Sequence, residues 1–95
     1  MKKLKCISER KVPRRFNLPW GSGEIIEEAS IMRSHWEPVI QLLRFDDGSR
    51  ALRFCVYSGK RFSRMPLIVG EDDVEELKEA ILKKREIHEL IRALV

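Results

Sequence analysis

Hydrophobic and polar residues alternate most regularly over Arg50–Tyr57 (RALRFCVY), and this period of two predicts a β-strand. The stretch Val39–Phe45 (VIQLLRF) is short and mainly apolar, which predicts a strand just before it. The residues between them, Asp46–Ser49, have the chemistry of a hairpin loop. After a second, glycine-containing turn, a third strand is expected over Phe62–Val69. Because Pro66 has no N–H for the ladder, we expect an edge or bulged strand there.

The C-terminal part of the chain, Glu71–Val95, contains no glycine or proline, which predicts one long helix. Asp72 and Glu75 have the spacing of a capping box, and acidic side chains are favourable at the positive pole of the helix dipole. We expect the first half of this helix to pack on the sheet. Its apolar positions are Val74, Leu77, Ala80 and Ile81.

The segments before the sheet are less regular. Residues 1–20 contain Pro13 and Pro19, which disfavour a helix, so an arm or a first edge strand is expected. Residues 24–36 are compatible with a helix or with an extended segment, and we prefer the helix. The apolar residues that have the spacing of one helix face are Ile25, Ile26, Ala29 and Met32.

A chain of 95 residues has room for one domain. The elements predict a single α+β domain, in which an antiparallel β-meander packs on a long C-terminal helix. Residues 1–20 are then the basic arm or edge strand, and residues 21–81 are the core of sheet and helix. Residues 82–95 are a helical oligomerisation tail.

The tail carries an apolar stripe that a small sheet cannot cover together with the first half of the helix. We therefore expect a second copy of the chain to cover it, as a homodimer or higher oligomer. The alternative is that the helix breaks near Lys83–Arg85 and the tail folds back as core. The stripe consists of Ile87, Leu90, Ile91 and Leu94.

The composition is that of a folded protein, with 43% hydrophobic and 36% charged residues. No apolar run is long enough for a transmembrane helix, and Met1–Cys6 lacks the apolar region of a secretory signal, so no membrane partner is expected. Cys6 and Cys55 have no metal-binding or redox spacing, and a reduced cytoplasmic protein is expected. The chain contains one asparagine (Asn17), one glutamine and no threonine. This low content resembles the residue usage of thermophiles.

The net charge of +4 is uneven, because residues 1–20 are strongly basic and the C-terminal helix is acidic. This asymmetry suggests a polyanionic partner, and a solvated tail is the alternative. Lys11, Arg14 and Arg15 in the arm are candidates for electrostatic capture of that partner. Trp20 is a candidate for stacking on a base, or else anchors the arm to the core.

Which side chains share a face of the meander depends on whether each loop has an even or an odd number of residues. If the first loop is even, Phe45 pairs with Arg50, and one face is apolar and meets the helix. Gln41 lies on that face and needs a hydrogen-bonding partner if it is buried. An odd loop would change this partition between the strands.

The opposite face would combine arginines with aromatic rings. Arginines neutralise phosphates and aromatic rings stack on unpaired bases, so the combination is typical of a platform for single-stranded nucleic acid. A solvated face, a second core layer and a protein interface are the alternatives. The candidate binding residues on this face are Arg44, Arg53, Arg64, Tyr57 and Phe62.

No pattern of residues indicates catalysis or a metal site. His35 and His88 are not at ligand spacing from each other or from a cysteine. Cys55 has no neighbouring histidine to activate it as a nucleophile. The Asp46-Asp47 pair is better explained by the turn. We therefore expect no enzyme activity, no metal and no cofactor.

Residues 39–81, VIQLLRFDDGSRALRFCVYSGKRFSRMPLIVGEDDVEELKEAI, resemble the ThermoDBP-related single-stranded DNA-binding proteins of thermophilic archaea. That resemblance implies an antiparallel sheet with helices and no OB barrel, a basic cleft lined by hydrophobic residues, and assembly through a C-terminal helix. The approach to the helix, Pro66-Leu67 and then Glu71-Asp72, is similar to the positive-cofactor-four transcriptional coactivators, which bind single strands as dimers. The basic arm and the longer final helix favour the first family.

The sequence thus predicts a protein that binds single-stranded DNA with little dependence on base sequence. Two other functions stay open. One is an RNA-binding or ribosome-associated module, which would use the same surface. The other is a small oligomeric adaptor or transcription cofactor that works through protein contacts.

Overall fold

The computed structural model describes residues 10–59 and 61–95. Cys6, the first nine residues of the predicted arm and Lys60 of the second turn lie outside the described residues. Five strands form one antiparallel sheet in the order β1-β2-β3-β4-β5. The strands are β1 (Arg14–Leu18), β2 (Gly21–Ser30), β3 (Glu37–Phe45), β4 (Arg50–Ser58) and β5 (Arg61–Ser63).

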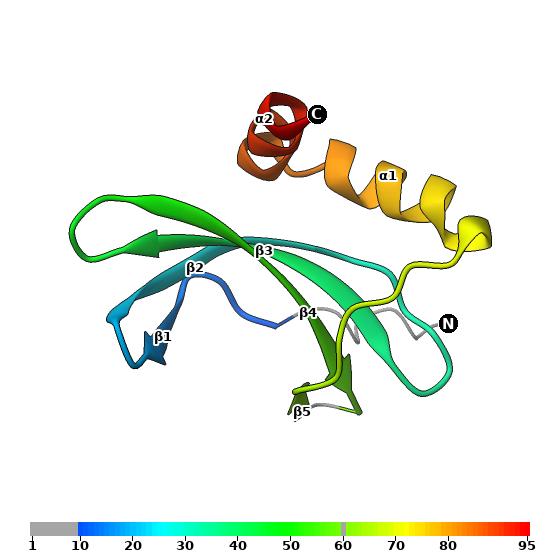
Figure 1. The fold of residues 1–95 in the computed structure, drawn as a ribbon, viewed down its shortest axis with the longest axis horizontal. Coiled ribbons are helices and arrows are strands. Elements are labelled where there is room, and N and C mark those ends of the chain that lie inside the picture. Colours follow the sequence, from blue (N-terminus) through cyan, green and yellow to red (C-terminus); the bar gives the residue numbers. More distant parts are fainter. Residues whose placement is uncertain (1–9, 60) are drawn as a thin grey trace.

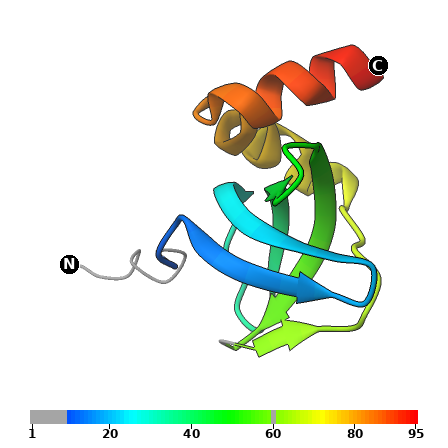
Figure 2. The same cartoon turned by 90° about the vertical axis from the view of Figure 1, so that its left-hand side faces the viewer.

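A 3-10 turn, η2 (Glu71–Asp73), leads into two short helices, α1 (Val74–Leu82) and α2 (Arg85–Leu94). Both helices lie over one face of the sheet, and the edge strands β1 and β5 curve away from them (Figure 1). The turned view shows how strongly the sheet curls (Figure 2). The α+β class and the antiparallel meander are therefore confirmed, whereas the single long helix is wrong.

The helix breaks at Lys83 and Lys84, and Lys84 has an extended backbone with φ −120° and ψ 102°. Glu27 of β2 explains where the second helix begins, because its carboxylate accepts the backbone N–H of Ile87 at 3.1 Å. A carboxylate at this end satisfies an orphan N–H and is favoured by the helix dipole. The capping box expected at Asp72 is not formed, since neither η2 nor α1 has a side-chain cap hydrogen bond.

The main core lies between the sheet and the two helices. Buried Ile40 and Leu42 of β3 pack there with Leu77 of α1 and Ile87 of α2. Ala80 and Ile81 also pack on this core, as expected, but Val74 is half exposed. A second cluster, formed by Phe16, Ile25 and Leu43, lies on the opposite face of the sheet.

Residues 24–36 were expected to be helical, and this is wrong, because β2 runs to Ser30. A β-bulge between Ile25 and Glu27 shifts the register of β2 against β3. The bulge places two adjacent residues on the helix side, because Ile26 packs against the main core and Glu27 pairs with Leu42 and reaches α2. That pattern imitates helical spacing. The third strand was also overestimated, since β5 ends at Ser63 and no regular structure covers the residues up to Pro66 and beyond.

The hairpin between β3 and β4 forms as expected, but its parity differs. Gly48 adopts φ +93°, and the backbone N–H of Phe45 donates to the Ser49 carbonyl at 2.8 Å. A short loop with a left-handed glycine makes Arg44 the partner of Arg50. Arg44 consequently lies on the helix side with Leu42, and Gln41 lies on the opposite face.

Candidate nucleic-acid interface

The face opposite the helices contains a buried polar network centred on Gln41. The side-chain amide of Gln41 is completely buried. It donates to Glu28 Oε2 at 2.7 Å and to the Tyr57 hydroxyl at 3.2 Å, and its oxygen accepts Arg53 Nε at 2.7 Å. The partner that burial of Gln41 requires is therefore present, from both neighbouring strands.

Two arginines close this network from the N-terminal side. Arg14 of β1 donates two hydrogen bonds to Glu28, at 3.1 and 2.7 Å, and one to the Tyr57 hydroxyl at 3.1 Å. Arg10 donates to both oxygens of Glu37, at 2.9 and 3.1 Å, and its Cζ lies 3.9 Å from the centre of the Tyr57 ring. The end of the predicted arm is thus fixed across β2, β3 and β4.

The electrostatics of the network favour ionised Glu28. Burial alone would raise the pKa of Glu28. Hydrogen bonds from Arg14 and Gln41, with the charge of Arg10, outweigh that effect and lower the pKa. The network therefore neutralises its own charges and leaves Arg10 and Arg14 occupied.

Beside the network, Arg53 and Phe62 form a surface of different character. The Arg53 Cζ lies 4.9 Å from the centre of the Phe62 ring, and the Phe62 ring makes an edge contact with Tyr57 at 5.6 Å. Phe62 is 49% exposed, while Tyr57 is buried. Arg61 and Arg64 flank Phe62 in the chain and are both exposed.

We call Arg53, Arg61, Phe62 and Arg64 the Arg53–Phe62 surface. Among the described residues, none of its three arginines forms an ion pair with a carboxylate. Arg53 and the half-exposed Phe62 ring are therefore brought together at the β5 edge of the sheet, with Arg61 on the other side of this edge strand and Arg64 just after its end.

Three of the predicted binding residues, Arg53, Tyr57 and Phe62, are brought together, with Tyr57 beneath the other two. Arg64 follows β5 closely. Arg44 is not part of this group, because the odd hairpin loop places it on the helix side, where it pairs with Glu24 at 3.5 Å.

The remaining candidates from the arm and the first turn lie elsewhere. Arg15 donates two hydrogen bonds to Asp46, both 2.9 Å long. Lys11 is exposed, and its carbonyl accepts a hydrogen bond from Arg14. Trp20 is 76% exposed at the β1–β2 turn, so it does not anchor the arm to the core.

The predicted oligomerisation residues are mostly used within the chain. Ile87 is fully buried in the core, and Leu90 and Ile91 pack against the same cluster. Leu94 is 69% exposed. The apolar stripe thus folds back over the sheet, which was the alternative to an intermolecular contact, and the reason is the break at Lys83 and Lys84.

Sequence reasoning missed Arg10, Glu28 and Glu37 as members of the buried network. A helical interpretation of residues 24–36 hides the fact that Glu28 faces Gln41 in the next strand. An extended interpretation with a bulge would have placed this glutamate beside Gln41, for which the sequence already indicated the need for a partner.

A metal site and a reactive thiol both place requirements on the histidine, cysteine and acidic residues of the described part of the chain. Among residues 10–59 and 61–95, no group of three or more His, Cys, Asp or Glu side chains could hold a metal ion. Burial raises the pKa of the Cys55 thiol to about 11, so at neutral pH it is protonated and a poor nucleophile. No helix in these residues has the length and hydropathy needed to cross a membrane.

Comparisons with protein-family models, with curated proteins and with solved structures found no match. The resemblance to ThermoDBP-related proteins and to positive-cofactor-four coactivators therefore stays an expectation.

Proposed function

We propose that this protein binds single-stranded DNA, with little dependence on base sequence, through the Arg53–Phe62 surface. The observation that carries the proposal is the half-exposed Phe62 ring under the guanidinium of Arg53. An exposed ring can stack on an unpaired base, and each such contact is worth about 1–3 kcal/mol.

The charges around Phe62 support this assignment. Seven arginines elsewhere in the described structure already form ion pairs with Glu or Asp: Arg10, Arg14, Arg15, Arg33, Arg44, Arg50 and Arg85. Arg53, Arg61 and Arg64 have no such carboxylate partner in the same part of the chain, so their charges remain for phosphates. We assign Arg14 and Arg15 to fixing the fold rather than to ligand capture.

The proposal implies a preference for single strands over duplex. A continuous duplex offers phosphates but no unstacked bases, so Phe62 would contribute nothing to its binding. A cofactor-free binding role in a reduced cytoplasm is part of the proposal, and the free, buried thiol of Cys55 supports it.

The test is fluorescence anisotropy with a labelled single-stranded oligonucleotide at two salt concentrations, with matched duplex and single-stranded RNA as competitors. We expect tight, salt-dependent binding of the single strand that duplex displaces poorly. Stronger competition by RNA would assign the surface to RNA. Absence of binding at low salt would overturn the proposal and leave an adaptor role through protein contacts.

We also propose self-association, through a groove between the two helices rather than through the buried stripe. The groove has a volume of about 330 Å³ and is lined by apolar residues of both helices, among them Leu82 and Ile91. Lys78 and Arg92 also line it, while Glu75 and Glu79 are exposed on α1. A second copy would supply both the apolar side chains and the complementary acidic ones.

A further inference from the structure

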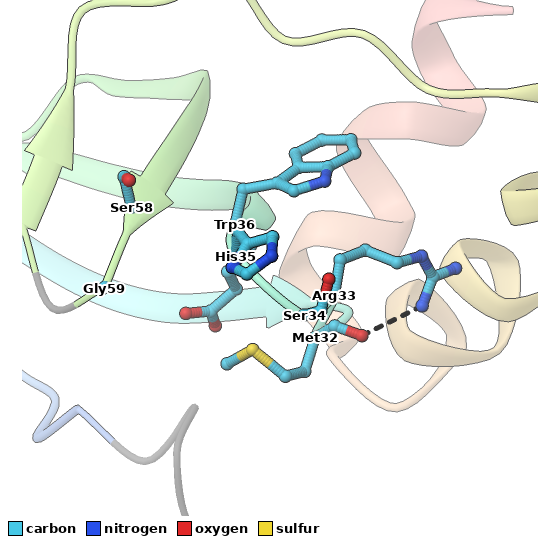
Figure 3. A pocket seen from close by; sticks show the side chains of 8 residues that line it. Met32, Arg33, Ser34, His35, Trp36, Ser58 and Gly59 are labelled. Carbon is cyan, nitrogen blue, oxygen red and sulfur yellow. Dashed lines mark hydrogen bonds between the residues drawn. The ribbon is translucent and has the colours of Figure 1, made fainter.

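A pocket of about 680 Å³ lies between the β2–β3 loop and the turn that ends β4. The side chains of Met32, His35 and Trp36 line it from the loop, and Ser58 and Gly59 lie across from them (Figure 3). In this view the Trp36 indole and the Met32 thioether project to opposite sides of the loop. The volume falls within the range of small-molecule sites, about 300–1,000 Å³.

The loop that forms the pocket is held in place without a ligand. The backbone N–H of Arg33 donates to the Trp36 carbonyl at 2.9 Å, which closes a tight turn. The Arg33 side chain donates to Asp73, with its Nε at 3.0 Å, and to Glu76 at 3.1 Å. Because Asp73 and Glu76 lie on the helical side of the fold, these contacts clamp the loop to α1. Because the pocket is already formed, binding a ligand would order few additional residues.

The chemistry of the lining matches a flat heterocycle. Trp36 and His35 provide aromatic rings, Met32 provides a polarisable thioether, and the hydroxyl of Ser58 can hydrogen-bond a base edge. Glu37, at the base of the pocket, is 1% exposed and is held by Arg10. Glu37 and Arg33 of the lining already have ionic partners, Arg10 and Asp73, so the lining suits a neutral base better than a charged phosphate.

The pocket reaches the β4–β5 edge of the sheet. Ser58, which lines it, pairs with the exposed Arg61, while the neighbouring pair, Tyr57 and Phe62, lies on the other face of the sheet. A strand lying on Phe62 would therefore pass around the short edge strand β5, beside Arg61, to reach the pocket. We propose that this pocket takes one unpaired nucleobase of the strand that lies on the Arg53–Phe62 surface. The inference rests on the proposed function and adds to it a second base contact at Trp36.

The test uses the intrinsic fluorescence of Trp36. The chain has two tryptophans, so Trp20→Phe leaves Trp36 as the only indole. This variant is titrated with an unlabelled single-stranded oligonucleotide and, separately, with adenosine, which has a base but no phosphate. We expect saturable quenching by the oligonucleotide at low concentration and by adenosine at much higher concentration.

A second measurement uses variants of the pocket. Trp36→Ala should weaken oligonucleotide binding by at least about fivefold, the lower end for one stacked base. Trp36→Phe, which keeps an aromatic ring, should restore most of the affinity. Circular dichroism checks that each variant is folded, and the quenching experiment does not depend on either of them.

The outcomes separate the pocket from the surface. If the strand binds by anisotropy but Trp36 is not quenched by strand or adenosine, the pocket inference is overturned and the proposed function stands. If adenosine quenches Trp36 but the strand does not bind, the pocket accepts a free base, and the proposed function fails together with the inference that the pocket takes a base of a bound strand. If neither ligand has an effect, both are wrong.

Discussion

The guanidinium of Arg53 lies over the ring of Phe62, with its Cζ 4.9 Å from the ring centre, while its Nε donates to the buried Gln41 at 2.7 Å. One side chain thus joins the interior network to the exposed ring. The position of Arg53 at the surface therefore depends on a hydrogen bond within the fold. Changes in the network should consequently alter the affinity for a ligand.

Replacing Gln41 with leucine, Gln41→Leu, should destabilise the fold by about 1–3 kcal/mol, because it removes donors from buried Glu28 and the Tyr57 hydroxyl. It should also release Arg53 and weaken binding of the single strand. Urea unfolding followed by circular dichroism measures the first effect. An unchanged unfolding midpoint would contradict the role given to this residue.

Acid should weaken the fold through Glu28. The pKa of Glu28 is lowered in the folded state from its ordinary value of 4.5, so the folded protein binds fewer protons than the unfolded chain. The resulting stability is fully present above pH 4.5 and is lost as the pH falls through the lowered pKa. Glu28→Gln should reduce the free energy of unfolding at neutral pH and make it less dependent on pH below that value. Unfolding curves at several pH values test this, and parallel pH profiles for both proteins would argue against it.

Gly23→Ala should prevent normal pairing of β2 with β3. A Cβ at this position would lie 2.1 Å from the Arg44 carbonyl oxygen and 2.6 Å from the Phe45 Cα, both of which are backbone atoms. Gly70→Ala is the matched control, since the nearest atom to a Cβ there is a carboxylate oxygen of Asp73 at 3.6 Å. Thermal melts should show a large decrease in melting temperature for Gly23→Ala only. Equal melting temperatures would show that the close approach is absent.

Leu82→Glu should shift the protein towards monomers, because it places a charge in the apolar groove between the helices. Val12→Glu is the control, since Val12 is partly exposed before β1. Sedimentation velocity over a range of concentrations measures the effect. If the unaltered protein is monomeric throughout, self-association through this groove is excluded at those concentrations.

Local patterns predicted the β3–β4 hairpin well, because alternation and turn chemistry act within a few residues of each other. The assignment of side chains to faces was wrong for the whole of β3 relative to β4, and the conformation of one loop residue is the reason. Whether Gly48 adopts a left-handed conformation decides if the loop is odd or even, and turn residues alone do not determine this. The error moved Arg44 to the helix side but left Arg53, Tyr57 and Phe62 together, since all three lie on β4 and β5.

The other errors have non-local causes. The bulge after Ile25 breaks the alternation of β2, so that Ile26 packs on the main core and the adjacent Glu27 reaches the start of α2. The helix break at Lys83 and Lys84 occurs without glycine or proline. It is stabilised by Glu27, which is distant in sequence and caps the start of α2. No short pattern near the break contains that information.

The most direct test of the central claim compares two phenylalanines on opposite faces of the sheet edge. Phe62 is 49% exposed on the Arg53–Phe62 surface, and Phe54 is 47% exposed on the helix side of β4. Single-strand affinity is measured by anisotropy for Phe62→Ala and Phe54→Ala, with unfolding curves to check both folds. We predict a loss of about fivefold or more for Phe62→Ala, as expected for one stacked base, and none for Phe54→Ala. Equal affinities for the two folded variants would contradict the account.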